Sequence, residues 1–472
     1  MPAALIPAAD PAARPIPIVL TDAASWPAAA ERLPAPARAF AQASGFTGQA
    51  GRHLLLPGRG GMLGMVLCGV EAADARHVDP FGPGRLSAQL PAGVYAFRGR
   101  LADPALAALS WLMSAYRFDR YRTPPAQEAK EGADEGARLV APRGVDIAET
   151  LRVAQAVAAS RDLINTPAND LGPAEIEEAI RQLAQTHGAQ VTSVVGDDLL
   201  AAGFPMVHAV GKGSARAPRL VDLVWGDPAH PRVTLVGKGV AFDTGGLNIK
   251  PESAMLLMKK DMGGAASAIA AARMVMGAGL PVRLRLIVPA VENAISGLSF
   301  RPGDVLQSRK GLTVEIGNTD AEGRLILGDA LALADEEAPE LLIDFATLTG
   351  AARVATGPDL PPVFTHDDRL AADLARLSAR VNDRCWRLPL WPPYDALLDS
   401  RIASVNHISG GPFAGSVTAA LFLNRFVEKA RSYAHFDIYA WSGSARPGRP
   451  EGGEPQAARL VYALVKERYP HS

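Results

Sequence analysis

Short runs of apolar residues recur along the C-terminal two thirds of the chain, and helical patterns separate them. Strands are expected in these runs, at residues 220–225, 233–236, 284–288, 341–345 and 434–439. Helices are expected between them, at residues 265–276 and 326–336. Continuous apolar runs of this length are typical of strands that are buried on both faces. The pattern predicts an α/β fold in which a mixed, largely parallel sheet is flanked by helices on both faces.

The N-terminal third repeats this alternation on a smaller scale. Residues 54–56 and 65–70 are expected to form strands, and residues 105–113 a helix. A polar segment broken by prolines, residues 124–132, predicts a loop. A helical pattern from Ile147 to Leu163 follows and ends near Pro167, because proline restricts the residue before it. We therefore expect a smaller N-terminal α/β domain over residues 1–145, a linker helix over 146–165 and a larger C-terminal domain over 166–472.

The composition is that of a soluble globular protein. The chain has 472 residues, of which 48% are hydrophobic and 21% charged, and the formal net charge is −1. No overall basic field would attract nucleic acid, so a nucleic-acid partner is not expected. Cys68 and Cys385 lack the spacing of a disulfide framework or a metal site. Without a signal-like N-terminus or an apolar run of about 18 residues, we expect no membrane span and, by default, a cytoplasmic location.

Candidate chemistry begins at residues 318–325, where Asp320, Glu322 and Arg324 alternate. In an extended segment alternate side chains share a face, so these three are expected to converge on one pocket. A second cluster upstream contributes Lys238 and Asp243, followed by Lys250 and Asp261. Lys238 directly follows one predicted strand and Thr347 follows another. Ligands of such sheets bind beyond the C-terminal ends of the strands.

These residue types suit a pair of divalent cations. Carboxylates bind hard or borderline divalent ions, and one carboxylate can bridge two of them. Two metals about 3.5–4 Å apart can hold a water between them as hydroxide and polarise a carbonyl oxygen. The acids are Asp243, Asp261, Asp320 and Glu322. Together they predict a two-metal site that hydrolyses amides.

The basic residues leave alternatives open. Lys238 can coordinate a metal only as the neutral amine, and its spacing favours a simple ion pair with an acid. A charged Lys250 could stabilise an oxyanion, or it could be a surface lysine. Arg324 could clamp a small anion, or it could pair with Asp320 or Glu322. Asp344 is expected to form structural hydrogen bonds, and the isolated His407 and His435 are expected to be packed or exposed and not to bind a metal. No GxxxxGK[ST] or GxGxxG motif is present.

Several separated blocks in this order resemble the leucyl aminopeptidases, the M17 cytosol aminopeptidase family. They are residues 165–171, 237–250, 260–266, 318–325 and 346–351. The resemblance implies that one, looser metal is held by Lys238, Asp243, Asp261 and Glu322. It implies that the tighter metal is held by Asp243, Asp320 and Glu322. Mn²⁺ or Zn²⁺, and also Mg²⁺ or Co²⁺, would suit these ligands.

The resemblance also implies catalytic and substrate-binding roles. Lys250 would stabilise the tetrahedral intermediate, and Arg324 would hold a bicarbonate ion that acts as general base, beside the Leu348 backbone. The free amine of a peptide would bind the looser metal. Residues that bind the substrate would be Lys250, Met258, Asp261, Thr347, Leu348 and Gly350. Family members form hexamers, so a homohexamer is expected.

Two regions depart from the commoner pattern of the family. Residues 353–359 carry unusual charge and proline, and residues 439–450 differ more. A bulky Tyr439 or Trp441 could reshape the pocket for the first side chain, so a preference for leucine does not follow. The expected function is a dinuclear metal-dependent aminopeptidase. The alternatives are a hexameric DNA-binding, recombination-accessory or regulatory protein on the same scaffold, or a narrow dipeptidase such as a Cys-Gly hydrolase.

Overall fold

The chain folds into two compact units in a computed structural model that describes residues 4–7, 15–123 and 136–471. The N-terminal unit comprises Met1–Ala158 and Gly443–Glu451, and the C-terminal unit comprises Ala159–Ser442 and Gly452–Ser472. The division falls within helix α4 (Ile147–Asn165), the helix expected at 147–163. The loop predicted at residues 124–132 lies outside the described residues.

The return of Gly443–Glu451 to the N-terminal unit was not foreseen, because these residues were assigned to the C-terminal domain. Within that unit the Gly448 amide donates to Ser114 Oγ at 2.8 Å. The Arg449 guanidinium lies 5.1 Å from the centroid of the Phe81 ring. Such contacts join segments more than 300 residues apart, so no local sequence pattern predicts them.

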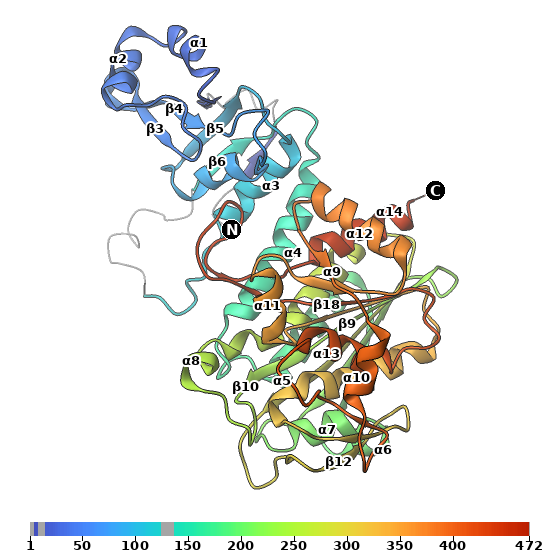
Figure 1. Cartoon of the computed structure of the whole chain (residues 1–472). Coiled ribbons are helices and arrows are strands. Elements are labelled where there is room, and N and C mark those ends of the chain that lie inside the picture. The colour runs from blue at the N-terminus through green and yellow to red at the C-terminus, as the bar shows by residue number, and fades with distance from the viewer. Residues whose placement is uncertain (1–3, 8–14, 124–135, 472) are drawn as a thin grey trace. The chain divides into compact units, whose positions relative to one another are not determined.

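A nine-stranded sheet forms the centre of the C-terminal unit (Figure 1). Its order is β16-β15-β18-β14-β9-β11-β8-β7, and β10 pairs with β11. The five predicted strands all form, and the bounds of the strands are β7 Gln190–Val195, β8 Arg219–Trp225, β9 Arg232–Gly237, β10 Gly239–Asp243, β11 Arg283–Asn293, β14 Leu341–Ala346, β15 Pro362–Phe364, β16 Trp386–Arg387 and β18 Tyr433–Asp437. The central strands β11, β9, β14 and β18 run parallel, as their continuous apolar sequences predict.

Helices cover both faces of this sheet (Figure 1). Helices α7, α10 and α13 share one apolar core with strands β9, β11 and β14, whereas α9, α12 and α14 pack on the other side. The bounds are α5 Pro173–His187, α6 Asp198–Ala201, α7 Pro205–Gly211, α8 Glu252–Met255, α9 Gly263–Gly277, α10 Glu322–Glu336, α11 Gly350–Thr356, α12 Asp368–Arg380, α13 Gly415–Asn424 and α14 Ala458–Arg468. The helices expected at residues 265–276 and 326–336 are α9 and α10.

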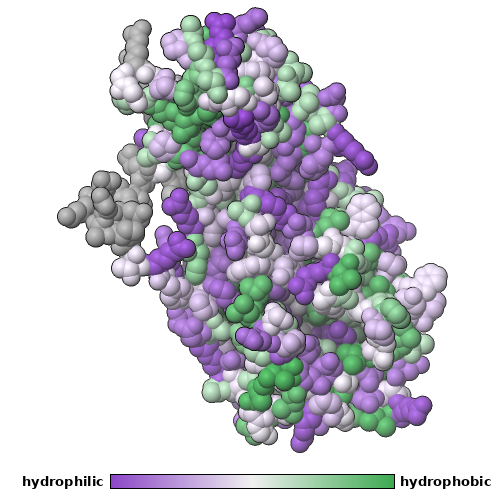
Figure 2. Space-filling view, turned by 60° about the vertical axis from the view of Figure 1, so that its left-hand side comes forward, coloured by the Kyte–Doolittle hydropathy of each residue, from purple (hydrophilic) through white to green (hydrophobic). Residues whose placement is uncertain are grey.

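Short elements complete the C-terminal unit. A three-stranded sheet joins β12 (Val305–Gln307), β13 (Thr313–Glu315) and β17 (Val405–Asn406), and β19 (Trp441–Ser442) pairs with β20 (Gly452–Gly453). Three 3₁₀ helices are η3 Met258–Met262, η4 Thr319–Ala321 and η5 Pro392–Leu398. Large apolar side chains remain exposed on this unit, among them Leu256, Leu298, Ile402 and Phe413. Figure 2 shows several hydrophobic patches on the face that it presents.

The N-terminal unit is built on a six-stranded sheet of order β1-β6-β5-β2-β4-β3, parallel except for the β3–β4 pair. The bounds are β1 Ala4–Ile6, β2 Ile16–Thr21, β3 His53–Pro57, β4 Leu63–Gly69, β5 Gly93–Arg98 and β6 Ala137–Val140. Its helices are α1 Trp26–Glu31, α2 Ala35–Ala43, α3 Pro104–Ser114 and the 3₁₀ helices η1 Arg59–Gly61 and η2 Gly82–Ala88. The strands and helix predicted in this third of the chain are therefore confirmed.

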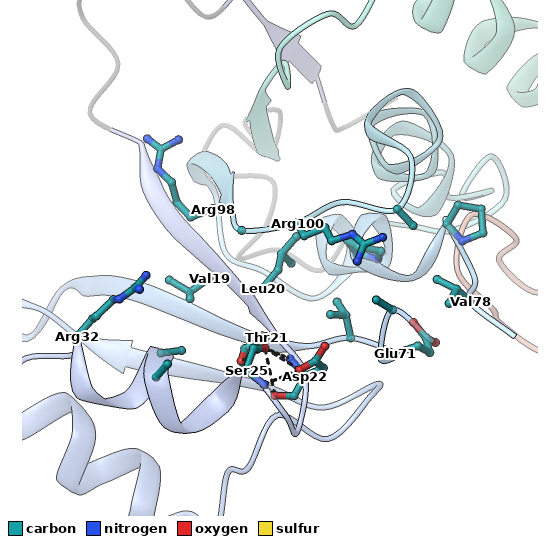
Figure 3. Close-up of a pocket in the computed structure, with 18 of the residues that line it drawn as sticks. Val19, Leu20, Thr21, Asp22, Ser25, Arg32, Glu71, Val78, Arg98 and Arg100 are labelled. Carbon is teal, nitrogen blue, oxygen red and sulfur yellow. Dashed lines mark hydrogen bonds between the residues drawn. The ribbon is translucent and has the colours of Figure 1, made fainter. Parts of the chain in front are cut away.

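A cavity of about 690 Å³ lies in the N-terminal unit, beside the ends of β2 and β5 (Figure 3). Asp22 and Ser25 in its wall hydrogen-bond to each other, and the Thr21 hydroxyl lies 3.1 Å from Ser25 Oγ. Three arginines, Arg32, Arg98 and Arg100, also line it. None of the residues expected to carry chemistry lies in this cavity.

The first turn of α9 packs directly on the strand ends that carry the expected site. A Cβ on Gly264 would lie 2.2 Å from the Phe345 carbonyl oxygen and 2.9 Å from the Lys238 nitrogen. The neighbouring Ala265 amide donates to the Lys238 carbonyl at 2.8 Å. Only glycine allows helix and strand backbones to approach this closely.

We therefore expect Gly264→Ala to destabilise the C-terminal unit by about 1–3 kcal/mol or more, because the added methyl forces the helix away from the sheet. Urea unfolding followed by circular dichroism measures the change. Gly410→Ala is the matched control, since a Cβ there meets no atom within 4 Å. Equal stability of the two variants would contradict this account of the packing.

Candidate metal centre

The expected site residues gather at one edge of the large sheet, where parallel strands end. Lys238 follows β9, Thr347 follows β14, and Asp243 is the last residue of β10. The Lys238 amide donates to the Phe345 carbonyl at 3.0 Å, which links the two strand ends. The prediction that Lys238 and Thr347 lie beyond C-terminal strand ends is confirmed.

Four carboxylates and two ammonium groups meet at this edge. Asp243, Asp320 and Glu322 each offer an oxygen, and these oxygens lie within 4.8 Å of one another. Lys238 Nζ lies 2.8 Å from Asp261 Oδ2 and 3.0 Å from Glu322 Oε1. The structure therefore brings together the five residues that the sequence proposed as metal ligands.

Lys238 is enclosed on every side. Its side chain is 3% exposed, and Nζ also donates to the Thr347 carbonyl at 2.8 Å. A Cβ on Gly323 would lie 2.5 Å from Lys238 Cε, so the glycine before Arg324 makes room for the lysine. Burial lowers the pKa of Lys238, but Asp261, Glu322 and Asp243 outweigh it and raise the pKa overall. Without a cation beside it, Lys238 is a charged partner of the acids, and it could coordinate a metal only after losing a proton.

Lys250 lies on the loop after β10 and faces the same acids. Its Nζ is 2.7 Å from Asp243 Oδ2 and also contacts Asp320 Oδ1. Burial lowers its pKa, but Asp243 and Glu322 raise it further, so the net shift is upward. Its side chain is 13% exposed. Lys250 is therefore not a surface lysine, which was one of the two interpretations left open.

The segment with the alternating charges is helical, which corrects the expectation of an extended chain. Asn318 accepts a hydrogen bond from the Asp320 amide through its side chain at 2.8 Å, and the chain then turns through η4 into α10. Glu322 and Arg324 lie in the first turn of α10. Two residues on a helix are separated by roughly 200° around its axis, so these side chains do not share a face.

Arg324 consequently points away from the acids that could have paired with it. Its Nη1 donates to the His407 carbonyl at 2.6 Å, and no ion pair joins it to Asp320 or Glu322 among the described residues. Its side chain is buried, and burial lowers its pKa to about 10 although Glu322 and Asp437 act to raise it. The guanidinium keeps donors available for a small anion.

His407, which we expected to be packed or exposed, is buried and holds the loop that precedes Asp320. Its Nε2 lies 2.9 Å from the Asn318 carbonyl, and its Nδ1 accepts from the Gly317 amide at 3.2 Å. Burial lowers the pKa of His407 to about 3, so the ring is neutral near pH 7. The neutral ring fixes the backbone on which Asp320 stands.

Asn293 and Thr319 are two supports that the sequence analysis missed. Asn293 Nδ2 donates to Asp243 Oδ1 at 2.8 Å and to the Thr319 carbonyl at 3.1 Å. Thr319 Oγ1 donates to the Gly245 carbonyl at 2.7 Å. They tie the loop after β10 to the loop before α10. Asn293 lies outside the charged blocks, and Thr319 is an uncharged residue inside one, so residue type gave no signal for either.

Of the predicted substrate-binding residues, Thr347 and Leu348 follow β14, and Met258 and Asp261 lie on η3. Thr347 Oγ1 contacts Asp261 Oδ1 at 2.8 Å, and Met258 begins the 3₁₀ helix that carries Asp261. Leu348 lies in the loop that leads into α11, and Gly350 is the first residue of that helix.

Asp437, at the end of β18, supports this loop and was also missed. It accepts from the amides of Leu348 and Thr349, each at 3.1 Å, and from Thr349 Oγ1 at 2.6 Å. Ser416 Oγ donates to the same carboxylate at 2.9 Å. The loop beside the acids is thus fixed by one buried carboxylate of the neighbouring strand.

The charge balance of the cluster fits divalent cations. Four carboxylates face two ammonium groups, which leaves two negative charges in a largely buried place. Burial, together with Asp243, raises the pKa of Glu322 to about 8, and burial, together with Asp261, raises that of Asp243 to about 6. Glu322 Oε2 is buried and accepts no hydrogen bond from the described residues. Added positive charge would relieve each of these costs.

Comparison with known proteins identifies the family. The model of the cytosol aminopeptidase family, catalytic domain, matches residues 158–463, and that of the M17 aminopeptidase N-terminal domain matches residues 16–132. The chain belongs to the cytosol aminopeptidase family. It is thus a metal-dependent aminopeptidase with the two-domain α/β architecture of that family, which confirms the resemblance seen in the sequence.

Individual relatives are similar to this protein along most of its chain. A probable cytosol aminopeptidase of Xylella fastidiosa is 39% identical over 437 residues, covering 86% of this chain and 87% of the relative. A probable cytosol aminopeptidase of Syntrophotalea carbinolica is 42% identical over 368 residues, covering 75% of this chain and 73% of the relative. The crystal structure of a cytosol aminopeptidase from Coxiella burnetii superposes with a TM-score of 0.91 at 42% identity, covering 99% of both chains.

The bottromycin maturation enzyme BotP in complex with Mn is a more distant neighbour. Its TM-score is 0.84 at 32% identity, and the match covers 96% of this chain and 100% of that one. Separately, none of the helices in the described ranges is both long and apolar enough to cross a membrane.

Because of its raised pKa, Glu322 makes the stability of the metal-free protein depend on pH. Between the ordinary pKa of about 4.5 and the folded value of about 8, Glu322 binds its proton more tightly in the folded state. Stability from this group is therefore present at low pH and lost as pH rises through that window. We expect Glu322→Gln to flatten the fall in unfolding free energy between pH 5 and pH 8.

Denaturant titrations of chelator-treated protein at several pH values measure this difference. The comparison between wild type and Glu322→Gln removes the contributions of groups outside the acid cluster, which the two proteins share. Identical slopes for the two proteins would show that Glu322 ionises normally in the folded state.

Proposed function

We propose that the chain releases the first residue of peptides at a site that holds two divalent metal ions. The observation that carries this proposal is the acid cluster of Asp243, Asp320 and Glu322, whose oxygens lie within 4.8 Å of one another. A buried carboxylate oxygen of Glu322 without a hydrogen-bond donor adds to it. A buried carboxylate oxygen that accepts no hydrogen bond is better explained as a metal ligand than as part of a structural ion pair.

In this proposal the ligand sets share two residues. Lys238, Asp243, Asp261 and Glu322 hold one cation, and Asp243, Asp320 and Glu322 hold the other. Oxygen donors with one amine suit Mn²⁺ or Zn²⁺, and also Mg²⁺ or Co²⁺. The Mn complex of BotP, a neighbour of the same fold, favours Mn²⁺ among these. When bound, the two ions would supply an activated water and polarise the scissile carbonyl.

The remaining charged residues act on the peptide and on protons. Lys250 donates a hydrogen bond to the carbonyl oxygen as it gains negative charge, because its ammonium faces the acid cluster and its raised pKa keeps it charged. Arg324 would hold a bicarbonate ion next to the Leu348 backbone, and that ion would supply a general base when bound. The guanidinium donors that face no acid support this role.

Asp320→Ala and Glu322→Ala should each lower kcat/KM for peptide hydrolysis by roughly 1,000-fold or more, because each removes a ligand of the metal pair. Release of the first amino acid from a peptide panel, with Mn²⁺ or Zn²⁺ added, measures the loss. Glu178→Ala, at an exposed acid of α5, is the matched control and should leave the rate unchanged.

Elemental analysis of the same three proteins separates metal loss from misfolding. Wild type and Glu178→Ala should carry close to two metal equivalents, and the two cluster variants fewer, with unchanged circular dichroism. Near-normal turnover of either cluster variant would overturn the dinuclear proposal.

We also infer that the chain assembles as a homohexamer. We infer a cytoplasmic location as well, because its relatives are named cytosol aminopeptidases. Support for assembly comes from large apolar side chains that are exposed on the C-terminal unit, such as Phe413 and Leu256, which are 82% and 81% exposed. Where such side chains form a contiguous patch, they mark protein–protein contacts.

Light scattering coupled to size-exclusion chromatography tests the assembly. The expected native mass is six times the 49.5 kDa mass of the chain. Elution at the mass of a single chain at micromolar concentration would remove the inference.

A further inference from the structure

Beside the acid cluster, the Tyr439 ring lies between two elements that each bring a cation to it. Arg353 Cζ, on α11, is 4.5 Å from the ring centroid, and Lys260 Nζ, on η3, is 4.7 Å from it. Among the described residues, neither cation makes a hydrogen bond or an ion pair through its side chain, although Lys260 is only 5% exposed. Unpaired cations held against an aromatic face keep their donors free for an anion.

This arrangement is fixed by the backbone around it. The amides of Tyr439 and Ala440 donate to Gln456 Oε1 at 2.8 and 3.0 Å, and Gln456 Nε2 donates to the Pro358 carbonyl at 2.8 Å. Pro358 follows α11, the helix that carries Arg353. Gln456 therefore ties the strand end that carries Tyr439 to the end of the Arg353 helix.

Under the proposed function, the cluster lies beside the loop at which the first residue of a peptide would bind. Thr347 contacts Asp261, the acid nearest the amine end of the peptide under the proposed function. Tyr439 lies two residues after Asp437, which binds the Leu348 amide of the same loop. A Cβ on Gly350 would lie 3.6 Å from Arg353 Nη2, which puts the guanidinium over that loop.

Trp441, the other bulky residue of this region, belongs to different surroundings. It lies on β19, and its ring is 5.7 Å from Lys259 Nζ, which donates to the Asn165 carbonyl at 2.7 Å. Of the two aromatic residues, Tyr439 is the one that contacts Arg353 and Lys260.

We propose that the pocket for the first side chain selects an acidic residue, with Arg353 binding its carboxylate and Tyr439 limiting the space for large apolar side chains. This inference rests on the proposed function. A leucine side chain there would cover Arg353 without giving it an acceptor, which costs free energy. A glutamyl side chain would instead offer the guanidinium a charged, bidentate acceptor.

The test compares kcat/KM on 4-nitroanilides of α-glutamate, glutamine and leucine, since glutamine matches glutamate in shape but not in charge. Wild type should favour glutamyl over glutaminyl and leucyl substrates. Arg353→Met should lower the glutamyl value by about 10- to 100-fold and change the glutaminyl value little, because only the charge-assisted bond is lost. Tyr439→Ala should raise the leucyl value about 10-fold or more, because it opens space.

Arg369→Met, at an exposed arginine of α12, is the matched control and should change none of the three values. A wild-type preference for leucyl over glutamyl substrate, or equal losses on glutamyl and glutaminyl substrates in Arg353→Met, would overturn the acidic pocket and leave the aminopeptidase proposal intact. Absence of hydrolysis of every substrate with Mn²⁺ and with Zn²⁺ would overturn both.

Discussion

A buried excess of negative charge at the end of a parallel sheet is the constraint on which the rest of the C-terminal unit depends. Four carboxylates face two lysines there, and Glu322 is almost completely buried. Such a cluster is costly to remove from water, so the fold must hold its members in place against their repulsion. Most of the polar contacts described for the site serve this purpose. Asn293 and Thr319 fix the two loops to each other, His407 fixes the turn before Asp320, and Asp437 fixes the loop after β14.

The sequence could predict where this cluster lies because its location follows from local pattern. Buried parallel strands are continuous apolar runs, and the polar residue directly after such a run must lie at the end of a strand. Lys238 and Thr347 satisfied that rule, and the strands β9 and β14 are neighbours. Asp344 was expected to form structural hydrogen bonds, and it accepts one from Tyr433 Oη at 2.8 Å and contacts His435 Nδ1 at 2.7 Å inside the core.

What the sequence could not predict depends on contacts between distant residues or on a single capping bond. The alternating Asp320, Glu322 and Arg324 look like an extended segment, but one side-chain bond from Asn318 starts a turn and the segment becomes helical. That change separates Arg324 from Glu322 and gives it the His407 carbonyl as partner. Asp437 and Asn293 carry no motif, because their role is defined only by the loops that fold onto them.

The residues around Lys238 are packed tightly against the acid cluster, whereas Arg353 is not. Substrate selectivity can therefore change without a change in the acids. Gly323 and Gly264 leave no space for a side chain beside Lys238, so the ligand side can accept little change. Arg353 is exposed and contacts the Tyr439 ring, which Lys260 also contacts. A substitution at Arg353 can therefore alter the charge that meets the first residue while the acids and Lys250 keep their positions. At the same sheet edge, the acid cluster must keep its charge balance, whereas the residue at position 353 can change.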